Sequence, residues 1–531
     1  MKQPDPVVCL RICLAIAATF VLAAAEASAQ LTDREQTPNA ANAGILKSLE
    51  QQIGTGTGDL LTPGSSMFLI KRDPARSIRR GRQLFQRKFT VAQGFGPRTS
   101  DGIGDIAAEA SLGAGLVDSC AGCHGRPRGA AGFGGDVVTR PDSRDAPHLF
   151  GLGLQEMLAD EITTELRRIR SQASEAAARQ RHGVTRPLVA KGIRYGSIRA
   201  LPNGSVDTSG VRGVDPDLRV RPFFAHGGTI SIREFLVGAF NAEMGLEALD
   251  PLLVTAVAGG RVTTPAGMVL DGSLDKIEAP PVANETDDSD ADGVRNEIPT
   301  ALVDHMEFYL LNYFKPAIYR QTQTTAAGLE AMREIGCTAC HVQNLSIDHD
   351  RRVADVETVY DPSRASFNGL FATASLRLAE TDDGSGFPTL KLPVEQSFVV
   401  RNFFADLKRH DLGPNFHERK YDGTVTTQLM TEPLWGVGTT APYGHDGRSI
   451  NLREVILRHG GEAQSSRDRF ESLPEPSKVA VAEFLESLVL FPPDDTASNL
   501  DPGDKNAAGY PQFGHGSIKL GALFNDVSEG E

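Results

Sequence analysis

Two C-x-x-C-H pentapeptides, CAGCH at residues 120–124 and CTACH at residues 337–341, constrain what this chain can fold into more than any other feature. In such a motif two thiols can attach a haem covalently, and the adjacent imidazole can bind its iron. Of the six cysteines in the chain, only Cys9 and Cys13 lie outside the motifs. The alternatives are a thiol redox pair and half of a zinc site. We therefore predict two covalent c-type haems with these attachment and iron-binding residues: Cys120, Cys123 and His124 for haem 1, and Cys337, Cys340 and His341 for haem 2.

Residues 1–29 have the pattern of a secretory signal peptide, with a basic residue, a short apolar run and a small-residue triplet before Gln30. We expect cleavage there, which predicts a periplasmic or secreted protein without a membrane span. The alternative is a membrane tether formed by an uncleaved signal. The net charge of −14 argues against binding to nucleic acid or anionic membranes, and it would suit a basic soluble partner.

A tandem repeat organises the rest of the chain. PFFAHGGTISIREFLVGAF at residues 222–240 is similar to APYGHDGRSINLREVILRH at residues 441–459, and the two haem motifs are separated by nearly the same number of positions. We therefore expect a mainly α fold of two tandem cytochrome c-like domains with long loops and insertions. The expected boundaries are residues 30–283 for the haem 1 domain, 284–298 for an acidic linker, 299–495 for the haem 2 domain and 496–531 for a Pro/Gly-rich tail.

The two copies differ at one position that matters for iron binding: it is His459 in the second copy and Ala239 in the first. A haem iron with two strong ligands is saturated and suits electron transfer, whereas an open position can bind peroxide or dioxygen. We predict that His459 is the second ligand of haem 2, the alternative being a helix cap or a surface histidine. Haem 1 would then keep an open position, unless His148 or His226 closes it.

Two carboxylates near the end of the first copy are candidates for acid–base catalysis at haem 1. Cleaving the O–O bond of peroxide heterolytically requires a group that takes a proton from one oxygen and returns it to the other. Glu243 follows the repeat directly, and its alternative role is an exposed acid at a helix end. Glu234 is the second candidate, but its counterpart Glu454 points to a structural role common to both copies.

Four segments together match a known pattern: GRQLFQRKFTVAQGFGP, SCAGCHG, FADLKRHDLGPNF and TEPLWGVGTTAPYGHDGRSINLREVILRHGGEAQSSRDRFESL. They resemble the di-haem oxidoreductases of peroxidase type, relatives of the bacterial di-haem cytochrome c peroxidases and of the di-haem rubber oxygenases. The resemblance implies that haem 1 reacts with hydrogen peroxide or dioxygen, and that haem 2 receives electrons from a small soluble donor of the cytochrome or cupredoxin type. It also implies that Glu243 is the catalytic acid, and that calcium binds between the haem domains to Asp145, Thr440 and Pro442.

The chain departs from the peroxidases in three places. They carry a displaceable distal histidine soon after the first haem motif, and this chain has none there, which implies that haem 1 reacts without reductive activation. Methionine takes the place of His459 in the peroxidases, so the histidine resembles the oxygenases. Relatives place a tryptophan between the haems, whereas the only one here, Trp435, is expected near haem 2, with Phe224 nearest the inter-haem position.

These features predict an exported di-haem c-type oxidoreductase of peroxidase type, with electrons passing from haem 2 to a peroxide-reactive haem 1. The first alternative is a di-haem oxygenase that cleaves an organic substrate with dioxygen. The second is a non-catalytic electron-transfer cytochrome in which both haems are saturated.

Overall fold

The computed structural model describes most of the chain between residues 53 and 489. The described residues are 53–87, 120, 124, 145–244, 246–289, 295–312, 317–318, 321–353, 357–360, 372–375, 379–393, 396–419 and 423–489. The predicted signal peptide, Cys123 and the predicted tail from residue 496 lie outside these ranges.

The described elements are mostly short. The α-helices are α3 (Ser66–Arg72), α4 (Pro74–Gln86), α6 (Leu152–Gln180), α7 (Ile232–Met244), α8 (Pro251–Val257), α9 (Thr300–Leu311), α10 (Gln323–Glu334), α11 (Leu452–Arg458), α12 (Gln464–Ser472) and α13 (Glu475–Glu486). Single 3-10 turns are η2 (Cys337–Ala339), η3 (Val437–Thr439) and η4 (Gly461–Ala463). The strands are β1 (Val184–Ala190), β2 (Ile193–Ala200), β3 (Val206–Asp207), β4 (Arg261–Thr263), β5 (Val269–Asp271), β6 (Ala317–Ile318), β7 (Leu345–Ile347), β8 (Glu357–Tyr360), β9 (Ala372–Ser375), β10 (Ala379–Thr381), β11 (Leu390–Leu392), β12 (Phe398–Val400), β13 (Arg409–Asp411), β14 (Glu418–Arg419), β15 (Val425–Thr426), β16 (Gln428–Met430) and β17 (Leu488–Val489).

The expectation of a mainly α fold is wrong. The structure is 39% helical with 14% strand, and an arrangement of two tandem cytochrome c-like domains is not evident in it. One antiparallel sheet has the order β1–β2–β3, and the remaining described strands form two-stranded sheets. The largest hairpin lies where only loops and insertions were expected. Its residues 184–200 alternate largely between buried and exposed, which is the period of two that a half-buried strand requires.

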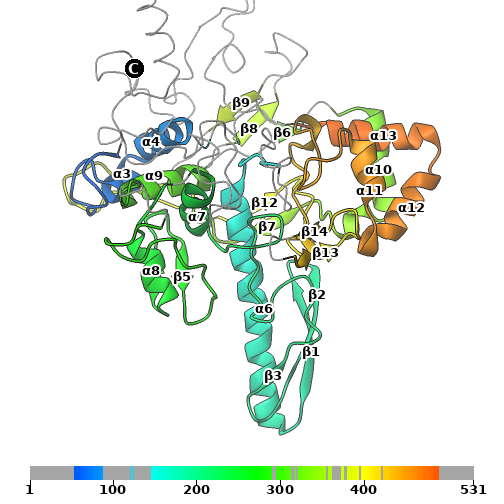
Figure 1. The fold of residues 1–531 in the computed structure, drawn as a ribbon, viewed down its shortest axis with the longest axis horizontal. Helices are drawn as coiled ribbons and strands as arrows, with labels where there is room; N and C mark the ends of the chain where they lie inside the picture. Colours follow the sequence, from blue (N-terminus) through cyan, green and yellow to red (C-terminus); the bar gives the residue numbers. More distant parts are fainter. Residues whose placement is uncertain are drawn as a thin grey trace, which may run out of the picture.

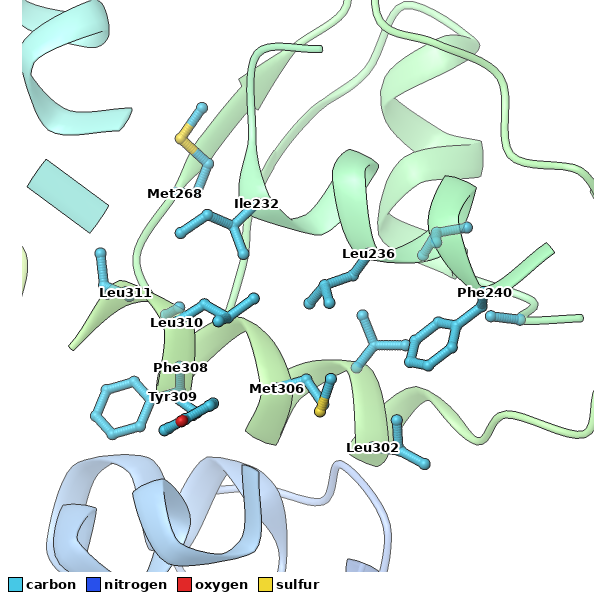
Figure 2. Packing of buried hydrophobic residues seen from close by; sticks show 14 of the residues in the cluster. Ile232, Leu236, Phe240, Met268, Leu302, Met306, Phe308, Tyr309, Leu310 and Leu311 are labelled. Atoms are coloured by element: carbon cyan, nitrogen blue, oxygen red, sulfur yellow. The ribbon is translucent and has the colours of Figure 1, made fainter. Parts of the chain in front are cut away.

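Helix α9 forms the centre of the first hydrophobic core, and residues 301–311 are all buried. Figure 2 shows Leu236 and Phe240, four residues apart on α7, pointing toward the α9 side chains. Helix α4 approaches so closely that a side chain at Gly81 would meet the α9 backbone. Cys120 packs against this core, so α4, α7 and α9 together position the first haem motif.

Helices α10 and α13 form the centre of another core, which positions the second haem motif. A capping box between Thr322 and Thr325 starts α10 by satisfying backbone N–H groups of its first turn. Gly328 allows the two helices to touch, because an added Cβ would lie only 2.0 Å from the carbonyl oxygen of Ala480. Cys337 packs against this core from the turn that follows α10.

Helix α6 is the longest element, and its 29 residues span about 43 Å at 1.5 Å per residue. The β1–β2–β3 sheet packs along its second half through Leu188, Tyr195 and Ile198. Figure 1 shows this helix and sheet extending together away from the rest of the described chain. None of the described helices, α6 included, has the length and apolar character needed to cross a membrane.

Candidate functional site

Two of the predicted iron ligands, His341 and His459, are oriented in the same way. His341 closely follows η2, and its Nδ1 lies 2.9 Å from the carbonyl oxygen of Phe404. His459 follows α11, and its Nδ1 lies 2.7 Å from the carbonyl oxygen of Val455. A carbonyl oxygen can only accept, so each Nδ1 donates and each Nε2 keeps the lone pair that binds a metal.

Both of these imidazoles are held in the neutral form that a metal requires. Desolvation lowers the pKa of His341. Desolvation, with smaller contributions that include the nearby His341, lowers the pKa of His459 to about 4. His341 contributes to the lowered pKa of His459, so the two rings are near enough to interact, and two imidazole nitrogens fit the donor set of a haem iron.

The environment of Cys337 in the second motif disfavours free-thiolate chemistry. Burial raises the pKa of the Cys337 thiol to about 11, and this residue packs against the α10–α13 core. A thiol held in the neutral form is a slow redox nucleophile. The environment of Cys337 therefore disfavours the thiol redox alternative.

Sequence reasoning assigned no site role to His410, a charged histidine beside Cys340. The Nε2 of His410 lies 2.9 Å from Asp406, and its Nδ1 lies 2.8 Å from Glu462. Burial lowers the pKa of His410, but the hydrogen bonds to Asp406 and Cys340 outweigh it and raise the pKa to about 10. The side chains of Cys340, Asp406 and His410 place their polar atoms within 4.8 Å of one another. The acid four residues before the histidine in FADLKRH was the available signal.

The first motif shows the same ligand orientation. The Nδ1 of His124 lies 2.7 Å from the carbonyl oxygen of Pro147, so its Nε2 is also left for a metal. The ring of Phe235 on α7 lies 6.5 Å from the His124 ring. Helix α7 therefore borders the site at which His124 would bind haem 1.

The two copies of the repeat end in different backbone conformations. Helix α11 stops at Arg458, and His459 is its C-cap residue with φ −57° and ψ 128°. Helix α7 continues to Met244, so Ala239 lies inside a helix rather than at its end. The position equivalent to His459 thus supplies no ligand beside haem 1, and α7 instead carries the partly exposed Glu243 in its last turn.

The two histidines named as alternative ligands of haem 1 differ in how they are bonded. The Nδ1 of His148 accepts from the N–H of Phe150 at 3.2 Å, and its Nε2 donates to the carbonyl oxygen of Trp435 at 3.1 Å. Both nitrogens of His148 are therefore used by the backbone. His226 stacks against Phe224 with ring centroids 6.1 Å apart, and it stays a candidate.

Trp435 lies between the two segments that orient the proximal histidines. Its carbonyl oxygen accepts from His148, which is next to Pro147 in the chain. Gly151, with φ 77°, approaches the indole so closely that an added Cβ would lie 2.6 Å from Cζ2. On the other side the Phe403 ring is 4.9 Å from the indole, and the next residue is Phe404, which holds His341. Phe224, expected nearest the inter-haem position, packs against Phe235 and is 39% exposed.

Glu234 has hydrogen-bonding partners that explain its presence without catalysis. One carboxylate oxygen accepts from the N–H of Ile230 at 3.1 Å and from the hydroxyl of Ser231 at 2.8 Å, and the other accepts from the N–H of Glu278 at 3.0 Å. Its counterpart Glu454 accepts from the N–H of the equivalent preceding residue at 3.0 Å. Both acids cap the start of their helices, which is a role common to the two copies.

The residues named for calcium lie close to one another. The N–H of Asp145 donates to the carbonyl oxygen of His445 at 2.8 Å. A Cβ added to Gly447 would lie 3.1 Å from Asp145 Cβ and 3.3 Å from Pro442 Cγ, so the acid and the proline face the same glycine. Thr440, two positions earlier, is buried. Calcium binding there stays a prediction.

A cluster of buried charges joins α7 to α9. The guanidinium of Arg233 is fully buried and contacts three buried carboxylates: Asp250 at 2.7 Å, Asp304 at 3.0 Å and Glu307 at 2.8 Å. The repeat counterpart Arg453 is 47% exposed and pairs with Glu475 at 2.6 Å. The same arginine of the repeat is thus a core residue in one copy and a surface residue in the other.

Comparison with known proteins finds one family model that matches part of the chain. Residues 373–488 match the model of the family described as "Di-haem oxidoreductase, putative peroxidase". No curated protein matches the chain. Among solved structures, the Kuenenia stuttgartiensis hydrazine synthase pressurized with xenon is similar at 14% identity with a TM-score of 0.20, over 38% of this chain and 58% of that one. That likeness is too low to support an argument about fold or function.

Proposed function

Because residues 373–488 carry the signature of the di-haem oxidoreductase family, we propose that this chain is an exported di-haem c-type oxidoreductase of peroxidase type. When bound, the two haems supply the redox chemistry, taking electrons from a small soluble donor at the second site and reducing hydrogen peroxide at the first. The predicted signal peptide supports a periplasmic or secreted location.

The observation that carries this proposal is the difference between the ends of α7 and α11. His341 and His459 both keep Nε2 for one metal, which favours a saturated electron-transfer centre. His124 has the same proximal orientation, but Ala239 cannot supply a second ligand. The bonding of both nitrogens of His148 further disfavours the electron carrier with two saturated haems.

Contacts through Trp435 support an electron path between the two sites. His148, Trp435 and Phe403 form a continuous line of packed groups from the segment that orients His124 to the segment that orients His341. A buried aromatic ring in such a line shortens the gap that an electron must cross. In this proposal Trp435 takes the inter-haem position for which the sequence alone suggested Phe224.

Glu243 is the residue we propose for acid–base catalysis. Its carboxylate takes the proton from one oxygen of hydrogen peroxide and returns it to the other, so that water can leave. Glu234 is less suited to this task, because both of its oxygens already accept hydrogen bonds at the start of α7. Reduction of one peroxide consumes two electrons and two protons and gives two waters.

A second candidate function is the oxygenation of an organic substrate with dioxygen. His459 favours this oxygenase function. The peroxidases carry methionine at this position, and a histidine there resembles the pattern of the oxygenases. An oxygenase would consume dioxygen and show little turnover of hydrogen peroxide with a reduced donor.

Spectroscopy of the purified holoprotein tests the proposal. We expect one high-spin and one low-spin haem, and a spectral change when hydrogen peroxide is added. In His459→Ala the low-spin signal should be lost, because the second site keeps only His341. The matched control is His417→Ala, which removes a partly exposed histidine that bonds Asp411 and should leave both signals unchanged.

A second measurement isolates the acid. Glu243→Gln should lower kcat for hydrogen peroxide reduction about 100-fold or more without altering either haem spectrum. Two low-spin haems that do not react with peroxide would contradict both enzymatic functions. Retention of the low-spin signal in His459→Ala would show that the ligand assignment is wrong.

A further inference from the structure

The second half of α6 and the adjacent sheet form a strongly basic projection. We call residues 168–212, which include β1, β2 and β3, the basic arm. It contains nine Lys and Arg against two Asp and Glu, a net charge of +7, whereas the whole chain carries −14. The rest of the chain therefore carries −21. Figure 1 shows the arm extending away from the rest of the described chain.

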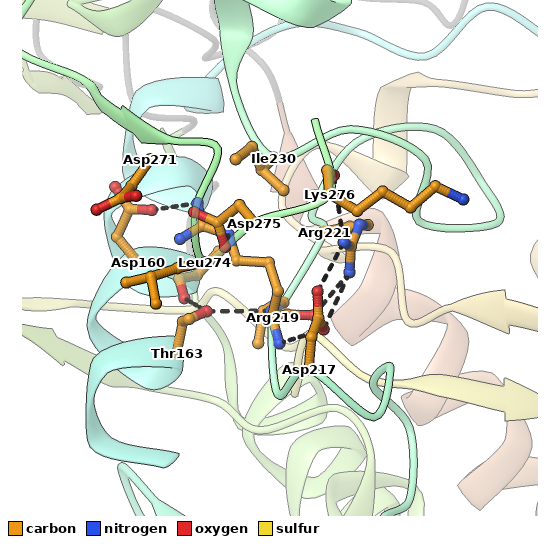
Figure 3. A network of polar contacts seen from close by, with 12 residues as sticks. Asp160, Thr163, Asp217, Arg219, Arg221, Ile230, Asp271, Leu274, Asp275 and Lys276 are labelled. Atoms are coloured by element: carbon orange, nitrogen blue, oxygen red, sulfur yellow. Dashed lines mark hydrogen bonds and ion pairs between the residues drawn. The ribbon is translucent and has the colours of Figure 1, made fainter. Parts of the chain in front are cut away.

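At the root of the arm, cations are paired with acids. Arg219 lies 2.6 Å from Asp160 of α6, and Arg221 lies 2.9 Å from Asp217. Figure 3 shows this network, in which the N–H of residue 220 also donates to Thr163 of α6. These contacts fix the direction of the arm and neutralise charge where it joins the body.

Beyond the root, most of the cations lack such close partners, although Arg179 lies 3.9 Å from Glu175 and Arg199 is opposite Asp207 in the register. Five exposed arginines make no ion pair with any residue that the structure describes: Arg168, Arg181, Arg186, Arg194 and Arg199. Like charges gathered on one small element repel one another and disfavour its folded form. This repulsion is reduced when the positively charged surface binds a negatively charged one.

The outer face of the sheet combines these charges with apolar surface. The register pairs Val189 with Arg194 and Thr185 with Arg199, so each arginine lies beside its partner on the neighbouring strand. Val189 is 38% exposed, and the neighbouring Pro187 is also exposed. Arginine beside exposed apolar side chains is typical of protein interfaces rather than of an inert surface.

We propose that the basic arm docks onto the acidic body of a second copy of this chain. The arm cannot fold back onto its own body, because α6 is one continuous helix with the sheet packed along it. The arm therefore pairs with acids of its own copy at the root, for example where Lys191 lies 2.6 Å from Glu161. A second copy offers the same body charge of −21, and a reciprocal exchange of arms closes a dimer with two-fold symmetry.

Sedimentation velocity of the holoprotein tests this proposal. We expect a dimer at about 20 mM NaCl that dissociates at about 500 mM, because screening shortens the reach of the charges. Reversing the arm charges with Arg181→Glu, Arg186→Glu and Arg194→Glu together should weaken dimerisation by at least about 100-fold, since close charge pairs at interfaces couple strongly.

The control applies the same change in net charge to exposed arginines of the body: Arg261→Glu, Arg401→Glu and Arg448→Glu. This triple variant should remain dimeric at low salt, and circular dichroism should show that both triple variants are folded. A monomer at low salt, a dimer unaffected by the arm reversal, or equal weakening in both variants would overturn the proposal. The test is independent of the haem assignments, because none of these residues belongs to either proposed site.

Discussion

The two arginines that occupy one position of the repeat allow a paired test of the core. Replacing Arg233 with alanine removes the cation shared by Asp250, Asp304 and Glu307, each no more than 1% exposed. Breaking a buried ion pair costs about 3–5 kcal/mol, because the remaining charge is left without compensation. Three carboxylates lose one cation here, so we expect the upper end of that range.

The loss should depend on pH. Burial raises the pKa of Glu307, so the folded protein binds this proton more tightly than the unfolded chain does. Without Arg233 the three acids must hold more protons to remain buried. The stability of Arg233→Ala therefore falls as the pH rises, and the deficit relative to the unmodified protein should be larger at about pH 8 than at about pH 5.5.

Urea unfolding followed by circular dichroism at both pH values measures the effect, and Arg453→Ala provides the control. Arg453 and Glu475 are exposed, so this variant should unfold at nearly the same urea concentration as the unmodified protein. If the two variants lose similar stability, then the buried cluster does not join α7 to α9 in the way that the contacts indicate.

Two further predictions concern single residues near the site. Burial raises the pKa of Glu156 from 4.5 to about 7, so its contribution to stability is present below pH 4.5 and is lost as the pH rises through about 7. Glu156→Gln should therefore flatten the fall in urea midpoint over that pH interval, and an unchanged slope would contradict this assignment. Trp435→Leu should slow electron transfer between the haems at least about tenfold in stopped-flow measurements, with both haem spectra retained, and an unaltered rate would exclude the path through the indole.

The haem motifs and the repeat could be read from the sequence because they depend on local spacing. The histidine at the end of NLREVILRH leaves its helix as the pattern predicts, and it lies near enough to His341 for that ring to lower its pKa. The capping role of Glu234 was also readable, since Ser231 and Glu234 have the spacing of a capping box. The motifs and the cap need only a few consecutive residues, and His459 needs only the comparison of two short segments.

The remaining features depend on packing between distant segments. The contact of His148 with Trp435 joins residues 287 positions apart, and no spacing rule connects them. Strands such as β14 and β15 contain two residues each, which is too short for an alternating pattern to be recognised. The mainly α expectation failed for this reason, and also because β1 and β2 bury their side chains with a period of two instead of the helical period.

Where α11 ends, the carbonyl of Val455 becomes available as a hydrogen-bond acceptor, and the side chain of His459 leaves the helix. The N–H of His459 bonds to Ile456 instead of continuing the helical pattern, which leaves the carbonyl of Val455 to hold the imidazole. In α7 the helix continues past Ala239, so the carbonyl of Phe235 is occupied by the helix's own backbone. A histidine introduced at Ala239 would therefore lack the acceptor that orients its counterpart. Restoring symmetry between the two copies would require shortening the helix together with replacing the residue.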